Sequence, residues 1–173
     1  MKKVKSMILK KLDLKSDITK KYQDWMNDLE VTKFTEQKYK KHTLKDIRNF
    51  VREKNNSKNE FLYGIFVKIN NLNTHVGNIK LGPIKWKHKT ADISYLLGEK
   101  KMWGKGYVTL AIKEIIKIAK NKKLKKLKAA TYEMNIGSKK VLIKNGFKVE
   151  GVLKSAIIFK KRRYASYIFG KKI

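Results

Sequence analysis

The chain contains no cysteine, and this absence excludes several kinds of chemistry at once. Disulfide bridges, thiolate metal sites and a cysteine nucleophile all require that residue. Histidine is also scarce, with His42, His75 and His88 as its three copies, and no His-Glu-x-x-His pattern is present. We therefore expect no metal site, and we expect each histidine to be a surface residue or a hydrogen-bonded structural residue.

Long hydrophobic runs are missing as well. No stretch of 18 apolar residues occurs, so no membrane-spanning helix is expected. Residues 1–6 are basic, but the apolar run at residues 7–9 is far too short for a signal peptide. We therefore expect a cytoplasmic protein with no membrane partner.

Acidic residues are few, because 14 Asp and Glu stand against 44 Lys and Arg, which gives a net charge of +30. Such a charge favours nucleic-acid binding. However, only four of the basic residues are arginines, the residue that base readout and bidentate phosphate contacts prefer. The lysines are also spread along the chain, which favours a solvated basic surface with weak, salt-sensitive binding to polyanions and no specific nucleic-acid partner.

Periodicity and turn residues predict a continuous succession of elements. Strands are expected at residues 7–12, 61–69, 75–81, 91–97, 124–131, 147–153 and 164–169, and helices at 18–29, 44–54, 107–120 and 136–145. Asp17 is expected to cap the first helix, Thr43 and Asp46 to form a capping box for the second, and Gly146 to end the last. Gly82-Pro83 is expected to break a strand. The order predicts one α+β domain over residues 1–173, with a mixed, mostly antiparallel sheet flanked by helices.

The most informative stretch joins the strand at residues 91–97 to the helix that starts at Tyr107. Between them lies a basic turn that contains Gly104 and Gly106. The first N–H groups of a helix lack internal partners, and glycines let a phosphate approach the backbone closely. This unit therefore predicts an anion site. The spacing fits neither a P-loop nor a dinucleotide fingerprint, which would need a third glycine where Thr109 stands.

The segment Lys101-Met102-Trp103-Gly104-Lys105-Gly106 resembles the Gln/Arg-x-x-Gly-x-Gly/Ala signature of the GCN5-related N-acetyltransferases (GNAT), with Lys101 in place of Gln or Arg. A second segment, from Asn135-Ile136-Gly137-Ser138 to Gly146-Phe147, resembles the family's Asn-x-x-Ser/Ala…Gly-Phe pattern. The element order also looks like the fold of this family. Within it, the chain resembles the branch with ribosomal-protein N-terminal acetyltransferases and bacterial amino-sugar-nucleotide acetyltransferases.

The resemblance implies acetyl-CoA as the acetyl donor and direct transfer to an amine, without a covalent enzyme intermediate. The coenzyme-binding residues that it implies are Tyr95, Leu96, Leu97, Lys101, Met102, Trp103, Gly104, Lys105, Gly106, Asn135 and Ser138. In this scheme the backbone of residues 95–97 pairs with the pantetheine arm, and one of its N–H groups polarises the thioester carbonyl.

Proton transfer needs further groups, because an alkyl amine is mostly protonated at neutral pH. Glu133 is the first candidate for the general base, and Asp92 is the alternative if it faces the acceptor. Leu142 stands where many relatives have a catalytic tyrosine, so Tyr132 or Ser138 is expected to replace it. For Glu133 the alternative is an exposed loop carboxylate, and for Ser138 it is a hydroxyl that satisfies helix N–H groups.

The acceptor that we favour is a nucleotide-linked amino sugar. Lys80, Lys85, Lys87 and Lys89 lead into the central strand and are expected to meet its diphosphate. The aromatic residues Trp25, Phe34, Tyr39 and Trp86 are expected to line the acceptor side. The alternatives are an N-terminal protein acetyltransferase and a non-catalytic basic interaction module, as a monomer or homodimer in each case.

Overall fold

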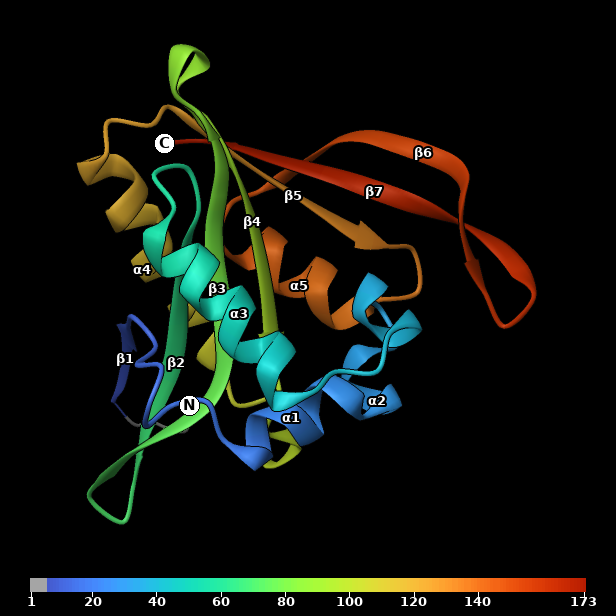
Figure 1. Cartoon of the computed structure of the whole chain (residues 1–173). Helices are drawn as coiled ribbons and strands as arrows, with labels where there is room; N and C mark the ends of the chain where they lie inside the picture. The colour runs from blue at the N-terminus through green and yellow to red at the C-terminus, as the bar shows by residue number, and fades with distance from the viewer. Residues whose placement is uncertain (1–5) are drawn as a thin grey trace.

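The computed structural model describes residues 6–173, and a seven-stranded sheet runs through this part of the chain (Figure 1). The strands are β1 (Met7–Lys10), β2 (Phe61–Ile69), β3 (Leu72–Lys85), β4 (Thr90–Leu97), β5 (Lys126–Tyr132), β6 (Lys148–Phe159) and β7 (Arg162–Lys172). Their order across the sheet is β1-β2-β3-β4-β5-β7-β6. Strands β4 and β5 are parallel and the other neighbouring pairs are antiparallel. The expected mixed, mostly antiparallel sheet is thus confirmed.

Helices cover both faces of the sheet. They are α1 (Lys20–Asn27), α2 (Leu29–Thr32), α3 (Leu44–Asn56), α4 (Tyr107–Asn121) and α5 (Ile136–Lys144), with short 3-10 turns η1 (Glu36–Tyr39), η2 (Trp86–His88) and η3 (Lys100–Met102). Helices α1 and α3 pack on one face through residues such as Trp25 and Val51. Helix α4 packs on the other through Ile112 and Ile115, and Leu142 of α5 joins the same cluster. Each fully buried large apolar side chain contributes roughly 1.5–3 kcal/mol, so these two clusters hold the layers together.

The parallel strands β4 and β5 separate after a short contact. Their register pairs Thr90 with Lys126 and Asp92 with Lys128, and it stops there. Beyond Asp92, β4 remains paired with β3, while β5 pairs with β7 along its whole length. The edge of β4 that faces β5 therefore lacks a strand partner over residues 93–97, and this opens a gap in the middle of the sheet.

Two sequence-based predictions at the start of the chain are wrong in detail. Helix α1 begins at Lys20, and its cap is Thr19, whose hydroxyl oxygen accepts the N–H of Tyr22. Asp17 instead closes the turn before the helix, because its carboxylate accepts the N–H of Asp13 and pairs with Lys10 at the end of β1. The expected helix over residues 18–29 ends at Asn27, and a separate short helix, α2, follows it.

The sheet itself is more extended than the sequence predicts. Strand β3 passes through Gly82-Pro83 because a bulge there shifts its register against β4 between Leu81 and Ile84. Proline lacks the ladder N–H, and a bulge is a position at which that loss is tolerated. Strands β6 and β7 form a long hairpin at one edge of the sheet (Figure 1), and its end contacts the segment around η1, where Phe159 packs on Phe34. No helix among residues 6–173 is long and apolar enough to cross a membrane. The prediction about the basic residues 1–5 falls outside the described part.

Candidate active site

The glycine turn between β4 and α4 is open to incoming ligands. Gly104 and Gly106 have φ angles of +72° and +86°, the left-handed region that glycine adopts without strain. A Cβ atom built on Gly104 meets nothing within 4 Å, so the space beside this residue is free. Gly106 is the N-cap of α4, whose first N–H groups point toward the turn. This arrangement is a backbone cradle suited to an anion.

The turn commits some of its own donors to internal hydrogen bonds. The N–H of Trp103 donates to Lys100 O at 3.0 Å, and that of Lys105 donates to Met102 O at 3.4 Å. The backbone N–H groups of Gly104 and Gly106 make no such bond within residues 6–173. The free donors for an anion are therefore those of the two glycines and of the first turn of α4.

Of the lysines around the turn, one is engaged in ion pairs and two are not. Lys100 forms ion pairs with Asp28 and Glu30, at 2.7 and 2.6 Å, and thereby ties the turn to α2. Lys101 and Lys105 are exposed, and neither forms an ion pair with another described residue. These two lysines supply the positive charge that remains available beside the cradle.

The open edge of β4 offers backbone groups to the gap. The N–H of Gly98 donates to Val76 O in β3, so strand alternation directs the groups of Leu96 toward β3 and those of Tyr95 and Leu97 toward the gap. The indole Nε1 of Trp103 donates to Leu97 O at 2.7 Å. The structure therefore leaves the N–H and C=O of Tyr95 and the N–H of Leu97 facing the gap.

A pair of hydroxyl groups crosses this gap from β4 to α5. Tyr95 Oη and Ser138 Oγ are 2.7 Å apart and hydrogen-bonded. Burial raises the pKa of Tyr95 to about 12, so its hydroxyl remains protonated at neutral pH. Asn135 caps α5, because its Oδ1 accepts the N–H of Ser138 at 3.1 Å, and this leaves its Nδ2 as a donor. The Ser138 hydroxyl bonds to Tyr95, and not to an N–H group of its own helix.

The end of β5 carries the two other predicted catalytic residues. The hydroxyl of Tyr132 donates to the Glu36 carboxylate in η1. Burial, followed by the contact with Glu36, raises the pKa of Tyr132. Glu133 Oε2 accepts the N–H of Ala165 in β7 at 2.9 Å. Asp92, the alternative base, pairs with Lys128 at 3.1 Å where β4 and β5 separate.

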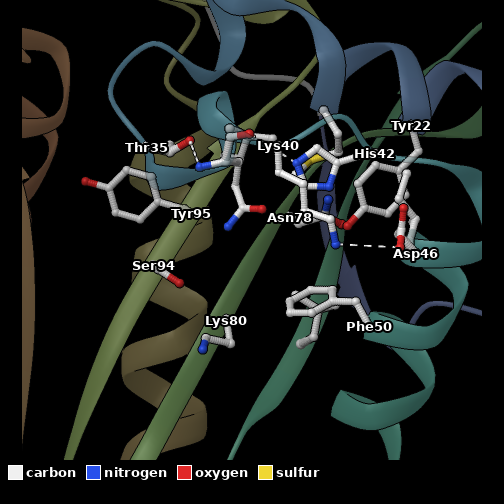
Figure 2. A pocket seen from close by; sticks show the side chains of 15 residues that line it. Tyr22, Thr35, Lys40, His42, Asp46, Phe50, Asn78, Lys80, Ser94 and Tyr95 are labelled. Carbon is white, nitrogen blue, oxygen red and sulfur yellow. Dashed lines mark hydrogen bonds and ion pairs between the residues drawn. The ribbon is translucent and has the colours of Figure 1, made fainter. Parts of the chain in front are cut away.

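A cavity of about 380 Å³ lies on the face of the sheet that α1 and α3 cover, next to the gap between β4 and β5 (Figure 2). Its polar lining includes His42, Asn78, Lys80 and Ser94, and Phe50 contributes an aromatic wall. Lys80 forms an ion pair with Glu60, and Lys40 lies 3.6 Å from Asp46. The cavity reaches Tyr95 and Leu96, so it meets β4 next to the gap.

The comparisons with known proteins decide the family. A family model described as an acetyltransferase (GNAT) domain matches residues 7–148. The chain belongs to the GNAT family. No curated protein sequence matches it. As a GNAT protein it is an N-acetyltransferase that uses acetyl-CoA as its acetyl donor.

Solved GNAT structures have the same fold. A microcin self-immunity acetyltransferase in complex with acetyl-CoA and AMP aligns with a TM-score of 0.81 at 24% identity, covering 96% of this chain and 92% of the other. A spermidine N-acetyltransferase from Vibrio cholerae in complex with CoA and spermine gives 0.82 at 14% identity, covering 96% and 95%. An acetyltransferase from Salmonella typhimurium that modifies the N-terminal serine of a 50S ribosomal subunit protein gives 0.79 at 17% identity, covering 97% and 95%.

The residues around the gap of this GNAT chain fit acetyl-CoA. The space beside Gly104 and the lysines Lys101 and Lys105 suit a pyrophosphate, and the unpaired edge of β4 suits the amides of the pantetheine arm. The coenzyme residues predicted at the turn, at Tyr95 and Leu97 and at the start of α5 leave free groups around the gap, whereas the backbone groups of Leu96 face β3 and the N–H groups of Trp103 and Lys105 are bonded within the turn. Met102 is partly buried against the core cluster beneath α4.

The acceptor side differs more from the sequence-based expectation. None of Trp25, Phe34, Tyr39 and Trp86 lines the cavity beneath α1 and α3. Trp25 is a core residue, and Phe34 packs on Phe159. Trp86 lies in the turn between β3 and β4, where its indole Nε1 donates to Asn59 Oδ1. Of the four predicted acceptor lysines, Lys80 lines the cavity. Sequence reasoning missed His42, Asn78 and Ser94. For Ser94, the alternation with buried Ile93 was a usable signal of its face.

Proposed function

We propose that this GNAT enzyme transfers the acetyl group of acetyl-CoA directly to a primary amine held in the 380 Å³ cavity. The observation that carries the proposal is that cavity and gap meet at the same stretch of β4. The donor approaches the open edge of β4 near Tyr95, and the amine approaches from the face that carries Ser94 and Leu96. A direct transfer requires this close approach of the two reactants.

We assign acetyl-CoA to the gap beside β4, where the sequence predicts it. Of the predicted turn residues, only those whose backbone N–H groups are free are assigned to its phosphates. Gly104 and Gly106 bind the pyrophosphate through their N–H groups, with Lys101 and Lys105 beside them. The backbone of Tyr95 pairs with the pantetheine arm, and Asn135 supplies its Nδ2. Bound acetyl-CoA supplies an activated thioester carbonyl, and the N–H of Leu97 or Tyr95 stabilises negative charge on its oxygen. A cytoplasmic location and a single catalytic domain remain predictions that agree with this donor.

Ser138 is our candidate for the group beside the departing sulfur. Its hydroxyl, bonded to Tyr95, lies between β4 and α5, where it can donate a hydrogen bond. Tyr132 is the second candidate, although its hydroxyl donates to Glu36 in this structure. Glu133 remains the sequence-based candidate for the general base, with Oε2 engaged by Ala165 and Oε1 unbonded among the described residues.

For the acceptor we propose a nucleotide-linked amino sugar. The cavity volume falls within the roughly 300–1,000 Å³ range of small-molecule sites. Its amide, hydroxyl and ammonium groups, from Asn78, Ser94 and Lys80, suit a polyhydroxyl acceptor with a phosphate, and Phe50 offers a ring for stacking. The AMP in the complex of the microcin acetyltransferase agrees with a nucleotide in this class of fold.

Competition kinetics test the acceptor. Acetyl-CoA turnover is measured with a nucleotide-linked 4-amino sugar, the free sugar amine and an alanine-starting peptide in the same reaction. The nucleotide-linked sugar should have the highest kcat/KM, and Lys80→Ala should reduce its advantage over the free sugar amine. Lys85→Ala is the matched control, since Lys85 does not line the cavity. A peptide that wins by about tenfold, a difference of 1.4 kcal/mol, would assign the enzyme to the protein N-terminal branch.

A further inference from the structure

His42 lies in the short segment between η1 and α3, and hydrogen bonds from α1 hold its backbone in place. Its N–H donates to Asn27 Oδ1 at 2.8 Å. Its C=O accepts Asn27 Nδ2 at 2.8 Å and Gln23 Nε2 at 3.0 Å. These three hydrogen bonds hold the backbone of His42 against α1.

That side chain lines the acceptor cavity with a defined tautomer. His42 is only 7% exposed, and its ring lies beside the cavity space (Figure 2). Nε2 lies 3.1 Å from Gln37 O. A carbonyl oxygen only accepts, so Nε2 carries the hydrogen and Nδ1 carries the free lone pair. Among residues 6–173, the contact with Gln37 is the one hydrogen bond that the His42 ring makes, and it leaves Nδ1 free.

We propose that Nδ1 of His42 is the general base that deprotonates the acceptor amine. This inference rests on the proposed function, because it requires an amine in the cavity. A buried imidazole with one nitrogen fixed by a backbone carbonyl and the other facing a substrate cavity is already oriented for proton transfer. Glu133 has a weaker geometric claim, since it does not line the cavity and Ala165 engages one of its oxygens.

The proton balance of the step is simple. One proton passes from the acceptor ammonium to Nδ1 of His42, which leaves a neutral amine with a free lone pair. That lone pair attacks the thioester carbon, the C–N bond forms and the C–S bond breaks. The electron pair of the C–S bond leaves on sulfur, and the second amine proton follows it to give the thiol. Imidazolium His42 then loses its proton to water, and no other reactant is needed.

The charged side chains that line the cavity near His42 are paired with partners of opposite charge. Lys40 and Asp46 lie 3.6 Å apart on the side of α3, and Lys80 on β3 pairs with Glu60. Tyr22 on α1 contributes a hydroxyl whose pKa is raised by burial, so it stays neutral. The two lysines that line the cavity are thus each paired with an acid.

The decisive variant is His42→Gln, because the glutamine amide can still donate to Gln37 O but has no basic nitrogen. With the best amine acceptor, kcat should fall by about 10²-fold or more, and the acidic limb of the pH–rate profile should disappear. The affinity for acetyl-CoA, measured by calorimetry, and the Tm should stay close to wild type. His88→Gln, an exposed histidine on η2, is the control and should change nothing.

A second measurement does not depend on turnover. Nitrogen-15 NMR of histidine-labelled wild-type protein should show His42 protonated on Nε2 and unprotonated on Nδ1, with the Nδ1 signal shifting when an amine acceptor is added. Turnover of His42→Gln within about threefold of wild type would overturn the proposal, as would a ring protonated on Nδ1. If wild type acetylates no amine, the proposed function fails instead, and the NMR tautomer alone then decides whether His42 is built as a base.

Discussion

At the scale of single residues, Gly104 and Gly146 show how the same backbone conformation serves two purposes. Both have positive φ angles, +72° and +79°. A Cβ on Gly146 would meet the flexible Lys171 Nζ at 2.7 Å, whereas a Cβ on Gly104 meets nothing within 4 Å. Gly146 therefore ends helix α5, as the sequence predicts, and Gly104 leaves space for a ligand.

This pair gives a matched test of the donor site. Gly104→Val should weaken acetyl-CoA binding by about tenfold or more, because a branched side chain blocks a charge-assisted hydrogen bond worth ~1.5–3 kcal/mol. Gly146→Val introduces a similar backbone strain far from the turn and should leave the affinity unchanged. Calorimetry on both folded variants makes the comparison. Equal affinities for Gly104→Val and wild type would contradict the site.

His75 is half-buried among the rings of Tyr22, Trp25 and Phe66. Burial lowers its pKa, and hydrogen bonds from Nε2 to Asn78 and Gly77 O only partly offset this effect. The unfolded chain therefore binds a proton first as the pH falls below about 6.5, the reference value for histidine. His75 thus contributes stability that is present above that pH and is lost as the pH falls toward its folded pKa.

The expected result is a free energy of unfolding that drops between pH 7 and pH 5, by at most about 1.4 kcal/mol per pH unit from this group. His75→Phe keeps an aromatic ring in the cluster and should flatten that dependence, whatever its effect on total stability. Urea unfolding at several pH values measures both slopes. Parallel slopes for the two proteins would show that His75 is not responsible.

At the scale of elements, the packing of α1 against the end of β4 joins the donor and acceptor sides. Gly98 follows β4, and a Cβ there would lie only 2.1 Å from Trp25 Cδ2 in α1. The same helix also holds the backbone of His42 through Asn27.

Gly98→Ala should accordingly destabilise the protein by about 1–3 kcal/mol, the usual cost of overpacking. Gly137→Ala is the control, since its Cβ would meet only Asn135 Oδ1 at 3.9 Å, and it should be neutral or slightly stabilising. Chemical denaturation gives both values. Unchanged stability in Gly98→Ala would mean that α1 does not pack on β4 in this way.

The sequence predicts these elements to different degrees. Strand β2 matches its expected bounds because its apolar run and turns are strong local signals, and the capping box of Thr43 and Asp46 is confirmed. The bulge that carries β3 through Pro83 depends on pairing with β4, which no local pattern reveals. The glycine turn was predictable because a cradle needs glycine at fixed spacing. The cavity beneath α1 and α3 was not, since its lining comes from α1, η1, α3, β2, β3 and β4 together, and only the tertiary structure places His42 and Ser94 in the same lining.

At the scale of the whole molecule, the charge of +30 remains the most unusual property of the chain. In the described residues several lysines pair with acids, including Lys54 and Lys80 with Glu60 and Lys100 with Asp28. With 14 acidic residues against 44 basic ones, the surface keeps a large excess of positive charge. The surface should therefore attract polyanions without selecting among them.

Duplex DNA should bind with an affinity that falls steeply and linearly in log salt and does not depend on sequence. Fluorescence anisotropy with two unrelated duplexes of equal length, over a range of salt concentrations, measures this. Tight binding to one of the two duplexes at physiological salt would contradict non-specific binding and would indicate a nucleic-acid function.

In the proposed reaction, acetyl-CoA and the acceptor amine meet at β4 from opposite sides, and a variant that fills the cavity tests this arrangement. Ser94 lies on the acceptor face of β4 and is exposed, so Ser94→Trp adds bulk to the cavity without disturbing the core. The measurement is kcat/KM for the acceptor amine in this variant, with acetyl-CoA affinity from calorimetry on the same preparation. We predict that kcat/KM falls by about 10²-fold or more, as a misplaced reactant requires, while the acetyl-CoA affinity stays at the wild-type value. An unchanged kcat/KM with the cavity filled would contradict this arrangement.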